Sequence, residues 1–156
     1  MNIKIYANGA INKDTENGGW ACILSTVLPN GKLYEVEHHG GCANTTIARM
    51  EITAVIEAFE HIKGNGHNIE VITNSRYVCN TFNTGWIDTV RENGWKKTTG
   101  ELPNVELWKH LWELVNAQDS VKFIRVKKKE YSKEHNIYLH KCTDIANMIS
   151  LSDIIN

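Results

Sequence analysis

The stretch KIYANGAI, residues 4–11, has the pattern of a β-strand that runs into a glycine turn and carries Asn8 near its end. Its side chains alternate between apolar and polar, which is the period of a strand with two different faces. A second stretch, VITNSRYV at residues 71–78, repeats the arrangement, because an apolar strand there closes on Asn74. Two strands that each end on a neutral amide raise the possibility of one shared polar site.

The gross composition is that of an ordinary soluble domain. The chain has 156 residues, of which 42% are hydrophobic and 22% charged, with a formal net charge of −1. We therefore expect a single domain over residues 1–156. No apolar run approaches the roughly 18 residues needed to span a bilayer, and the polar start MNIKIYANG does not resemble a signal peptide. These features predict a cytoplasmic protein, or one made inside a host cell, with no membrane partner.

The order of the predicted elements indicates an α/β fold. Three strands joined by short connections form an antiparallel meander, and the apolar period then changes to that of a helix that stops at Gly64. A fourth strand, three helical segments, a fifth strand and a closing helix follow. We expect a five-stranded mixed sheet flanked by helices. The strands are expected at residues 3–8, 18–28, 33–40, 68–73 and 121–126, and the long helices at 45–64, 103–118 and 133–151.

Two carboxylates lie on the apolar stripes of predicted helices. Glu51 falls among apolar residues of the first long helix, and Asp144 falls beside Ile145 and below Met148 on the last one. Each could be a carboxylate at the rim of its stripe that reaches water, since a buried charge without a partner costs several kcal/mol. Taken together with the two amides that end neighbouring strands, they favour a shared polar site.

The cysteines and histidines leave one alternative open. The scattered cysteines contain no CxxC pair, which favours reduced and mostly buried thiols over disulfides. A zinc site is a weaker alternative, because neither candidate set has a recognised ligand spacing. The cysteines are Cys22, Cys42, Cys79 and Cys142, and the candidate zinc sets are His38, His39 and Cys42, or His135, His140 and Cys142.

Motifs along nearly the whole chain resemble those of the type 1 ribonuclease H family, and they occur in the family's order. The family has a first strand ending in Asp-Gly, a helix with Arg-Met-Glu-Leu, a Thr-Asp-Ser-x-Tyr-Val motif, a helix with a basic protrusion and a last helix with Asp-x-Leu-Ala. The corresponding stretches are IYANGA (5–10), GGWACIL (18–24), RMEITAVIEAFE (49–60), TNSRYV (73–78), NGWKKTTGELPNVELWKHL (93–111), FIRVKKK (123–129) and CTDIAN (142–147).

The resemblance implies a ribonuclease H-like fold and a particular site. The family hydrolyses the RNA strand of an RNA/DNA hybrid with two Mg²⁺ or Mn²⁺ ions held by four carboxylates. Those four positions correspond to Asn8, Glu51, Asn74 and Asp144, which become the candidate catalytic and metal-binding residues. Lys129 stands where the family places a mobile histidine in the loop after the last strand.

Two amides in place of two acids change what such a site can do. At about 4 Å and an effective dielectric constant near 20, each charge pair is worth roughly 4 kcal/mol before desolvation. We therefore expect weakened metal binding and strongly impaired hydrolysis. Asn8 and Asn74 are either native or introduced replacements, and further departures from the family at Ile47, Ala48 and His140 favour natural degeneration.

Three functions remain to be weighed from the sequence. The first is a module that binds RNA/DNA hybrid without efficient cleavage. The second is an active hybrid endoribonuclease, with Mn²⁺ as an alternative to Mg²⁺, and the third is a protein-interaction module on the same fold. Candidate contacts to the hybrid come from the resemblance to the family's basic protrusion and from two further basic residues, Arg76 and Lys128. The two tryptophans among them could equally pack in a hydrophobic core. The candidates are Trp86, Trp95, Lys96, Lys97, Asn104, Arg76 and Lys128.

Overall fold

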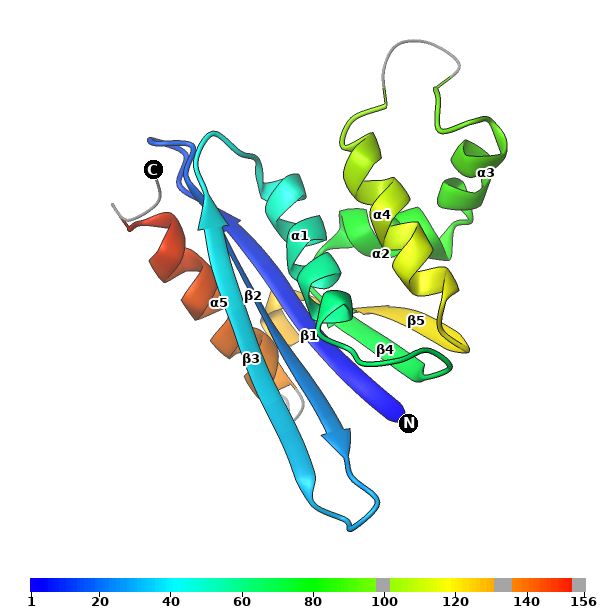
Figure 1. The fold of residues 1–156 in the computed structure, drawn as a ribbon. Coiled ribbons are helices and arrows are strands. Elements are labelled where there is room, and N and C mark those ends of the chain that lie inside the picture. Colours follow the sequence, from blue (N-terminus) through cyan, green and yellow to red (C-terminus); the bar gives the residue numbers. More distant parts are fainter. Residues whose placement is uncertain (98–101, 131–135, 153–156) are drawn as a thin grey trace.

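A computed structural model describes residues 1–97, 102–130 and 136–152. A five-stranded mixed sheet forms the centre, with strand order β3-β2-β1-β4-β5 (Figure 1). The strands β1, β2 and β3 pair antiparallel, and β1 pairs parallel with β4, which pairs parallel with β5. The predicted meander and mixed sheet are therefore confirmed. The strands are β1 (Asn2–Ile11), β2 (Gly18–Val27), β3 (Leu33–Cys42), β4 (Asn68–Thr73) and β5 (Ser120–Arg125).

The helices cover both faces of the sheet. One apolar cluster packs α1, α2 and α4 against the sheet, and a second packs α5 against the opposite face. In Figure 1, α3 and α4 stand beside α2 at the β4–β5 side of the molecule. The helices are α1 (Ile47–Glu60), α2 (Arg76–Asn83), α3 (Trp86–Glu92), α4 (Val105–Asn116) and α5 (Ile137–Ser150), with a short 3₁₀ turn, η1, at Lys128–Glu130.

The central strand is buried on both faces, and this follows from its sequence. Ile3, Ile5 and Ala7 of β1 belong to the cluster on the α1 side, whereas Tyr6 belongs to the cluster on the α5 side. Both faces of a strand with helices on either side must be apolar. A polar side chain in the buried part of β1, such as Asn8, therefore needs hydrogen-bond partners within the protein.

Two glycines let helices approach the sheet closely. A Cβ atom at Gly9 would stand 2.6 Å from the backbone nitrogen of Glu51 in α1. A Cβ atom at Gly19 would stand 2.3 Å from the backbone oxygen of Ala146 in α5. Both distances are shorter than van der Waals contact, so only glycine fits at these positions. This close approach brings both helices to the sheet around the end of β1.

No helix in the described part of the chain is long and apolar enough to cross a membrane. The four cysteines are free thiols, with Cys22, Cys79 and Cys142 buried and Cys42 exposed.

Candidate functional site

Asn8 lies at the centre of a buried hydrogen-bond network. Its side chain is 1% exposed. The amide nitrogen Nδ2 donates to the backbone oxygen of Leu139 at 3.2 Å and to Oγ1 of Thr143 at 2.8 Å. The oxygen Oδ1 accepts from Oγ1 of Thr73 at 3.3 Å and from the backbone nitrogen of Asn74 at 3.2 Å. The amide thus connects β1 with the end of β4 and with α5.

The donors of this network require an amide at residue 8. Two of the partners, Leu139 O and Thr143 Oγ1, accept hydrogen bonds from Nδ2. An ionised carboxylate has no hydrogen to donate, although the Thr143 hydroxyl can turn to donate to it. The network therefore fits asparagine, because aspartate would leave the Leu139 carbonyl without its donor.

Glu51 faces the same region from α1. The helix begins where the Thr46 side chain accepts a hydrogen bond from the backbone nitrogen of Arg49. Burial raises the pKa of the Glu51 carboxyl, and a hydrogen bond with the Ser75 side chain acts in the opposite direction. Ser75 also caps α2 by accepting from the backbone nitrogen of Val78 at 3.1 Å. Glu51 is thus a half-buried acid held beside the start of α2.

Asn74 contributes its backbone to the site. Its N–H donates to Asn8, and its carbonyl oxygen accepts from Nε of Arg125 at 3.4 Å. Asn74 follows β4 directly, and the register pairs the last residue of that strand, Thr73, with Arg125. The sheet therefore places a guanidinium group next to the loop that carries Asn74.

Asp144 lies on the solvent side of α5. Its side chain is 65% exposed, and Oδ2 stands 3.8 Å from Nε2 of His140. The predicted placement on an apolar stripe with Met148 is wrong, because Met148 is itself 69% exposed. The buried face of α5 instead carries the smaller side chains that fit close to β2, together with one leucine: Leu139, Cys142, Ala146 and Ser150.

The four predicted site residues come from elements that meet at the end of β1. Asn8 bonds directly to the backbone of Asn74, and its neighbour Gly9 packs against the backbone of Glu51. Thr143, the neighbour of Asp144, accepts from the Asn8 amide. The fold thus gathers the segments that carry all four positions.

The donor set in this region does not fit a pair of Mg²⁺ ions. Hard cations prefer charged oxygen ligands, and only Glu51 and Asp144 supply a carboxylate among the four positions. The side-chain nitrogen of Asn8 donates to two acceptors within the protein, and its side-chain oxygen already accepts two hydrogen bonds. No group of three histidine, cysteine or acidic side chains suited to a metal ion occurs among the described residues.

The predicted basic positions after β5 are at the surface. Lys128 and Lys129 lie in η1, and both are exposed. Arg76, the first residue of α2, is also exposed. His135, a member of one predicted zinc set, lies outside the described residues.

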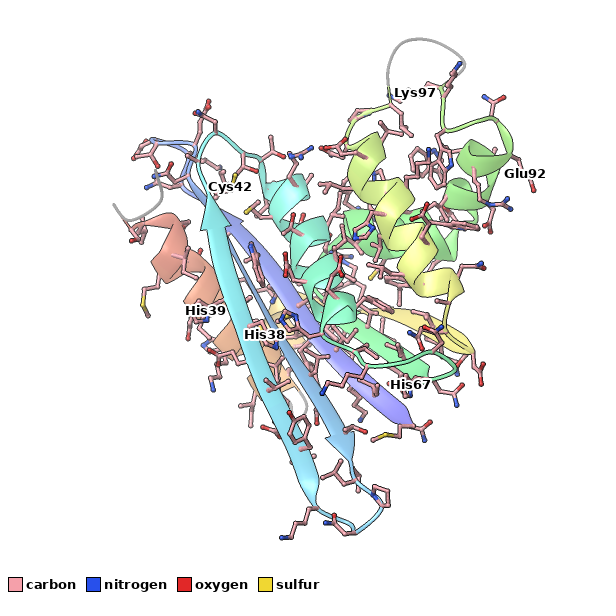
Figure 2. The ribbon with its side chains drawn as sticks, viewed as in Figure 1. His38, His39, Cys42, His67, Glu92 and Lys97 are labelled. Carbon is pink, nitrogen blue, oxygen red and sulfur yellow. The ribbon has the colours of Figure 1, made fainter. Side chains whose placement is uncertain are left out.

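The predicted nucleic-acid contacts around α3 and α4 divide into packing and surface residues. Trp95 packs against Trp112 with ring centroids 6.2 Å apart, whereas Trp86 is 36% exposed and lies with its ring centroid 6.5 Å from that of Trp108. Lys96 and Lys97 are exposed, and Figure 2 shows Lys97 well away from the sheet. They border an open hollow with Trp86.

Asn104 is engaged within the protein. Its φ of 59° places it in the left-handed region at the start of α4. Oδ1 accepts a hydrogen bond of 3.0 Å from Nη1 of Arg49, which also contacts Oε1 of Glu106 at 2.7 Å. Asn104 thus helps to join α1 to α4.

The first predicted zinc set does not converge. Figure 2 labels His38, His39 and Cys42 along β3. His38 stacks on His61 with ring centroids 3.4 Å apart, and His39 faces Glu37 at 3.6 Å. The Cys42 thiol contacts the backbone oxygen of Ala43. In the second set, Cys142 is buried whereas His140 is exposed.

Sequence reasoning missed three residues of the site. Thr143 and Ser75 each adjoin a predicted residue, and each carries a hydroxyl that bonds another one. Arg125 ends β5 at the register position of Thr73. The sequence shows these polar residues beside the predicted ones. Whether their side chains reach the site depends on how α2, α5 and β5 pack, which the sequence does not give.

Comparisons with known proteins agree with this architecture. Residues 1–139 match the family model described as RNase H. A ribonuclease H of Syntrophomonas wolfei is 40% identical over 114 residues, which are 72% of this chain and 75% of that protein. LC9-RNase H1, a type 1 RNase H with the type 2 active-site motif, has a TM-score of 0.76 at 23% identity, over 95% of this chain and 73% of that one. LC11-RNase H1, solved in complex with RNA/DNA hybrid, has a TM-score of 0.64 at 16% identity, over 94% of each chain.

Proposed function

Because this chain belongs to the ribonuclease H family, we propose that it binds RNA/DNA hybrid and that its two-metal hydrolysis is lost or strongly impaired. A solved relative of the same fold is in complex with RNA/DNA hybrid, which supports the choice of ligand. The exposed bases Lys96, Lys97, Arg76 and Lys128 are the proposed contacts to its phosphates.

The hydrogen bonding of Asn8 is the observation that supports the loss of hydrolysis. A ligand to a dication must direct an oxygen lone pair at the ion, and an uncharged amide attracts that ion only as a dipole. The oxygen of Asn8 instead accepts from Thr73 and Asn74, and its nitrogen donates to Leu139 and Thr143. Rotating the amide oxygen toward a metal ion would break this buried network.

Two measurements on the same preparation test the proposal. Fluorescence anisotropy with a labelled hybrid, at two salt concentrations, should show binding that weakens as salt rises. Cleavage of the same hybrid with Mg²⁺ or Mn²⁺ should give no more product than a chelator blank. Absence of salt-dependent binding would refute the binding function, and metal-dependent product would refute the loss of hydrolysis.

A second candidate is a weak, Mn²⁺-dependent hybrid endoribonuclease. The two retained carboxylates, Glu51 and Asp144, favour it, because they are the charged oxygen ligands that could still attract one divalent ion. Product that appears with Mn²⁺, and disappears in a Glu51→Gln variant, would establish this function instead.

A further inference from the structure

Basic side chains gather where β5 ends, beside the start of α2. Lys127, Lys128 and Lys129 follow Arg125 after only Val126, and Arg76 opens the neighbouring helix. All five bases are exposed. None of them forms an ion pair with a carboxylate among the described residues, where the ion pairs of lysine and arginine join Arg49 to Glu106 and Lys141 to Glu37. With Glu130 as the one carboxylate of the same described segment, the five bases give the cluster a net positive charge.

Arg125 is the member of this cluster that the structure ties to the site. Its Nε donates to the backbone oxygen of Asn74 at 3.4 Å. The backbone around it is fixed, because Val126 donates from its nitrogen to the oxygen of Thr73 at 2.9 Å. A guanidinium has five N–H donors, so this contact leaves further donors to point outward.

The charges of Arg125 and Glu51 both reach the Cys79 thiol near the start of α2. Burial raises the pKa of the Cys79 thiol to about 11, while the charge of Arg125 lowers it and that of Glu51 raises it. Cys79 lies in α2, one turn from the Ser75 cap that bonds Glu51. The two opposite charges therefore flank the start of α2 from β5 and from α1.

A strand of nucleic acid in this place meets a different electrostatic environment from that of a four-carboxylate site. Phosphates are repelled by clustered acids unless metal ions neutralise them. Here two of the four positions are amides, and an arginine stands beside one of them. Guanidinium groups bind phosphate oxygens through two parallel hydrogen bonds.

We propose that Arg125 binds a backbone phosphate of the RNA/DNA hybrid next to Asn74, so that binding at this site needs no divalent metal ion. The inference rests on the proposed hybrid-binding function. The hydrogen bond from Arg125 to the backbone oxygen of Asn74 orients the guanidinium before the hybrid binds. The lysines of the cluster, in contrast, are point charges on flexible side chains.

Hybrid binding by anisotropy in the full chain tests this role. Binding is measured in EDTA and in Mg²⁺ at matched ionic strength, for the parent, Arg125→Ala and Arg125→Lys. We expect the parent affinity to change less than twofold between EDTA and Mg²⁺. Arg125→Ala should bind about five- to tenfold more weakly, with a salt slope smaller by about 0.7–0.9, the value for one phosphate contact. Arg125→Lys should keep most of that slope, because it keeps the charge.

Two controls separate a phosphate contact from a structural role. Lys32→Ala removes an exposed positive charge in the turn between β2 and β3, and it should leave affinity and slope unchanged. Thermal melting should place Arg125→Ala within about 2 °C of the parent. A parent that binds hybrid only with Mg²⁺, or an Arg125→Ala variant with the parent's slope, would overturn the inference and leave hybrid binding intact. A parent with no hybrid binding at all would refute the proposed function itself.

Discussion

Restoring a carboxylate at residue 8 should destabilise the protein when no metal is added. In Asn8→Asp the side chain stays buried, but the hydrogen bond donated to Leu139 O is lost, whereas the Thr143 hydroxyl can turn to donate to the carboxylate. The lost hydrogen bond costs about 1–1.5 kcal/mol, and leaving a charged oxygen against a backbone carbonyl adds about 1 kcal/mol or more. We expect a loss of about 2–3 kcal/mol in the free energy of unfolding at pH 7, or about 7 °C in melting temperature.

The loss should depend on pH in a defined direction. Burial and the facing carbonyl of Leu139 favour the neutral form of the new carboxyl, whereas the hydrogen bonds from Thr73 and Asn74 favour the charged form. We expect burial and the carbonyl to dominate, so that the pKa of this carboxyl in the folded state lies above that in the unfolded state. Its protonated form can donate one hydrogen bond, so the deficit is smallest below about pH 4, the ordinary pKa of aspartate. The deficit then grows as pH rises through the folded-state pKa.

Urea unfolding in EDTA at pH 4 and pH 7 measures this deficit. Asn74→Asp is the matched control, because residue 74 enters the network through its backbone N–H and C=O. The control should lose less than about 1 kcal/mol. An Asn8→Asp variant within about 0.5 kcal/mol of the parent at pH 7 would show that the Asn8 amide is not held as the structure describes.

Three further predictions concern the same site. Asn8→Asp combined with Asn74→Asp should melt below the parent in chelator and then gain stability with Mg²⁺, by about 2.7 kcal/mol at 100 times the Kd, with hybrid cleavage appearing in the same samples. A double variant with neither a metal-dependent shift in melting temperature nor cleavage would contradict the assignment of the four positions. Thr143→Val should cost about 1–2 kcal/mol in urea unfolding because it removes an acceptor of the Asn8 amide, and Thr143→Ser should cost less than about 0.5 kcal/mol; equal losses would count against that hydrogen bond. Burial raises the folded-state pKa of Glu51, so the contribution of its carboxyl to stability is largest at low pH and falls as pH rises. Glu51→Gln should therefore gain stability relative to the parent between pH 4 and pH 7. A difference in unfolding free energy that stays constant over this range would be evidence against the shift.

Most of the fold could be predicted from the sequence because its signals are local. The alternation in β1 and the change of period at α1 identify these elements without any knowledge of packing. The motif resemblance then implies a ribonuclease H-like fold, and the observed sheet has the predicted five strands. The closing helix begins at Ile137 in the structure, later than the predicted residue 133, and residues 131–135 lie outside the described part of the chain.

The orientation of α5 could not be predicted in the same way. Apolar side chains occur around much of this helix, including the exposed Ile137 and Met148, so its sequence does not define one stripe. The close approach to Gly19 instead brings the backbone of Ala146 and Ser150 and the Cβ of Ile149 against the sheet. The prediction placed Asp144 on an apolar stripe, or at its rim, from hydrophobicity alone, whereas this contact between a helix and a glycine in the sheet depends on tertiary packing.

The same packing explains why an amide at residue 8 is more than a missing charge. Once α5 lies close to the sheet, the carbonyl of Leu139 faces Asn8, and an amide donates to it where a bare carboxylate cannot. On the other side of the site, Arg125 adds a positive charge next to Asn74. Both features shift the local potential in the same direction, away from cations and toward phosphate. Restoring one carboxylate returns only one of the two missing negative charges, and two divalent ions need both, which is why single replacements at Asn8 or Asn74 should recover far less metal binding than the pair.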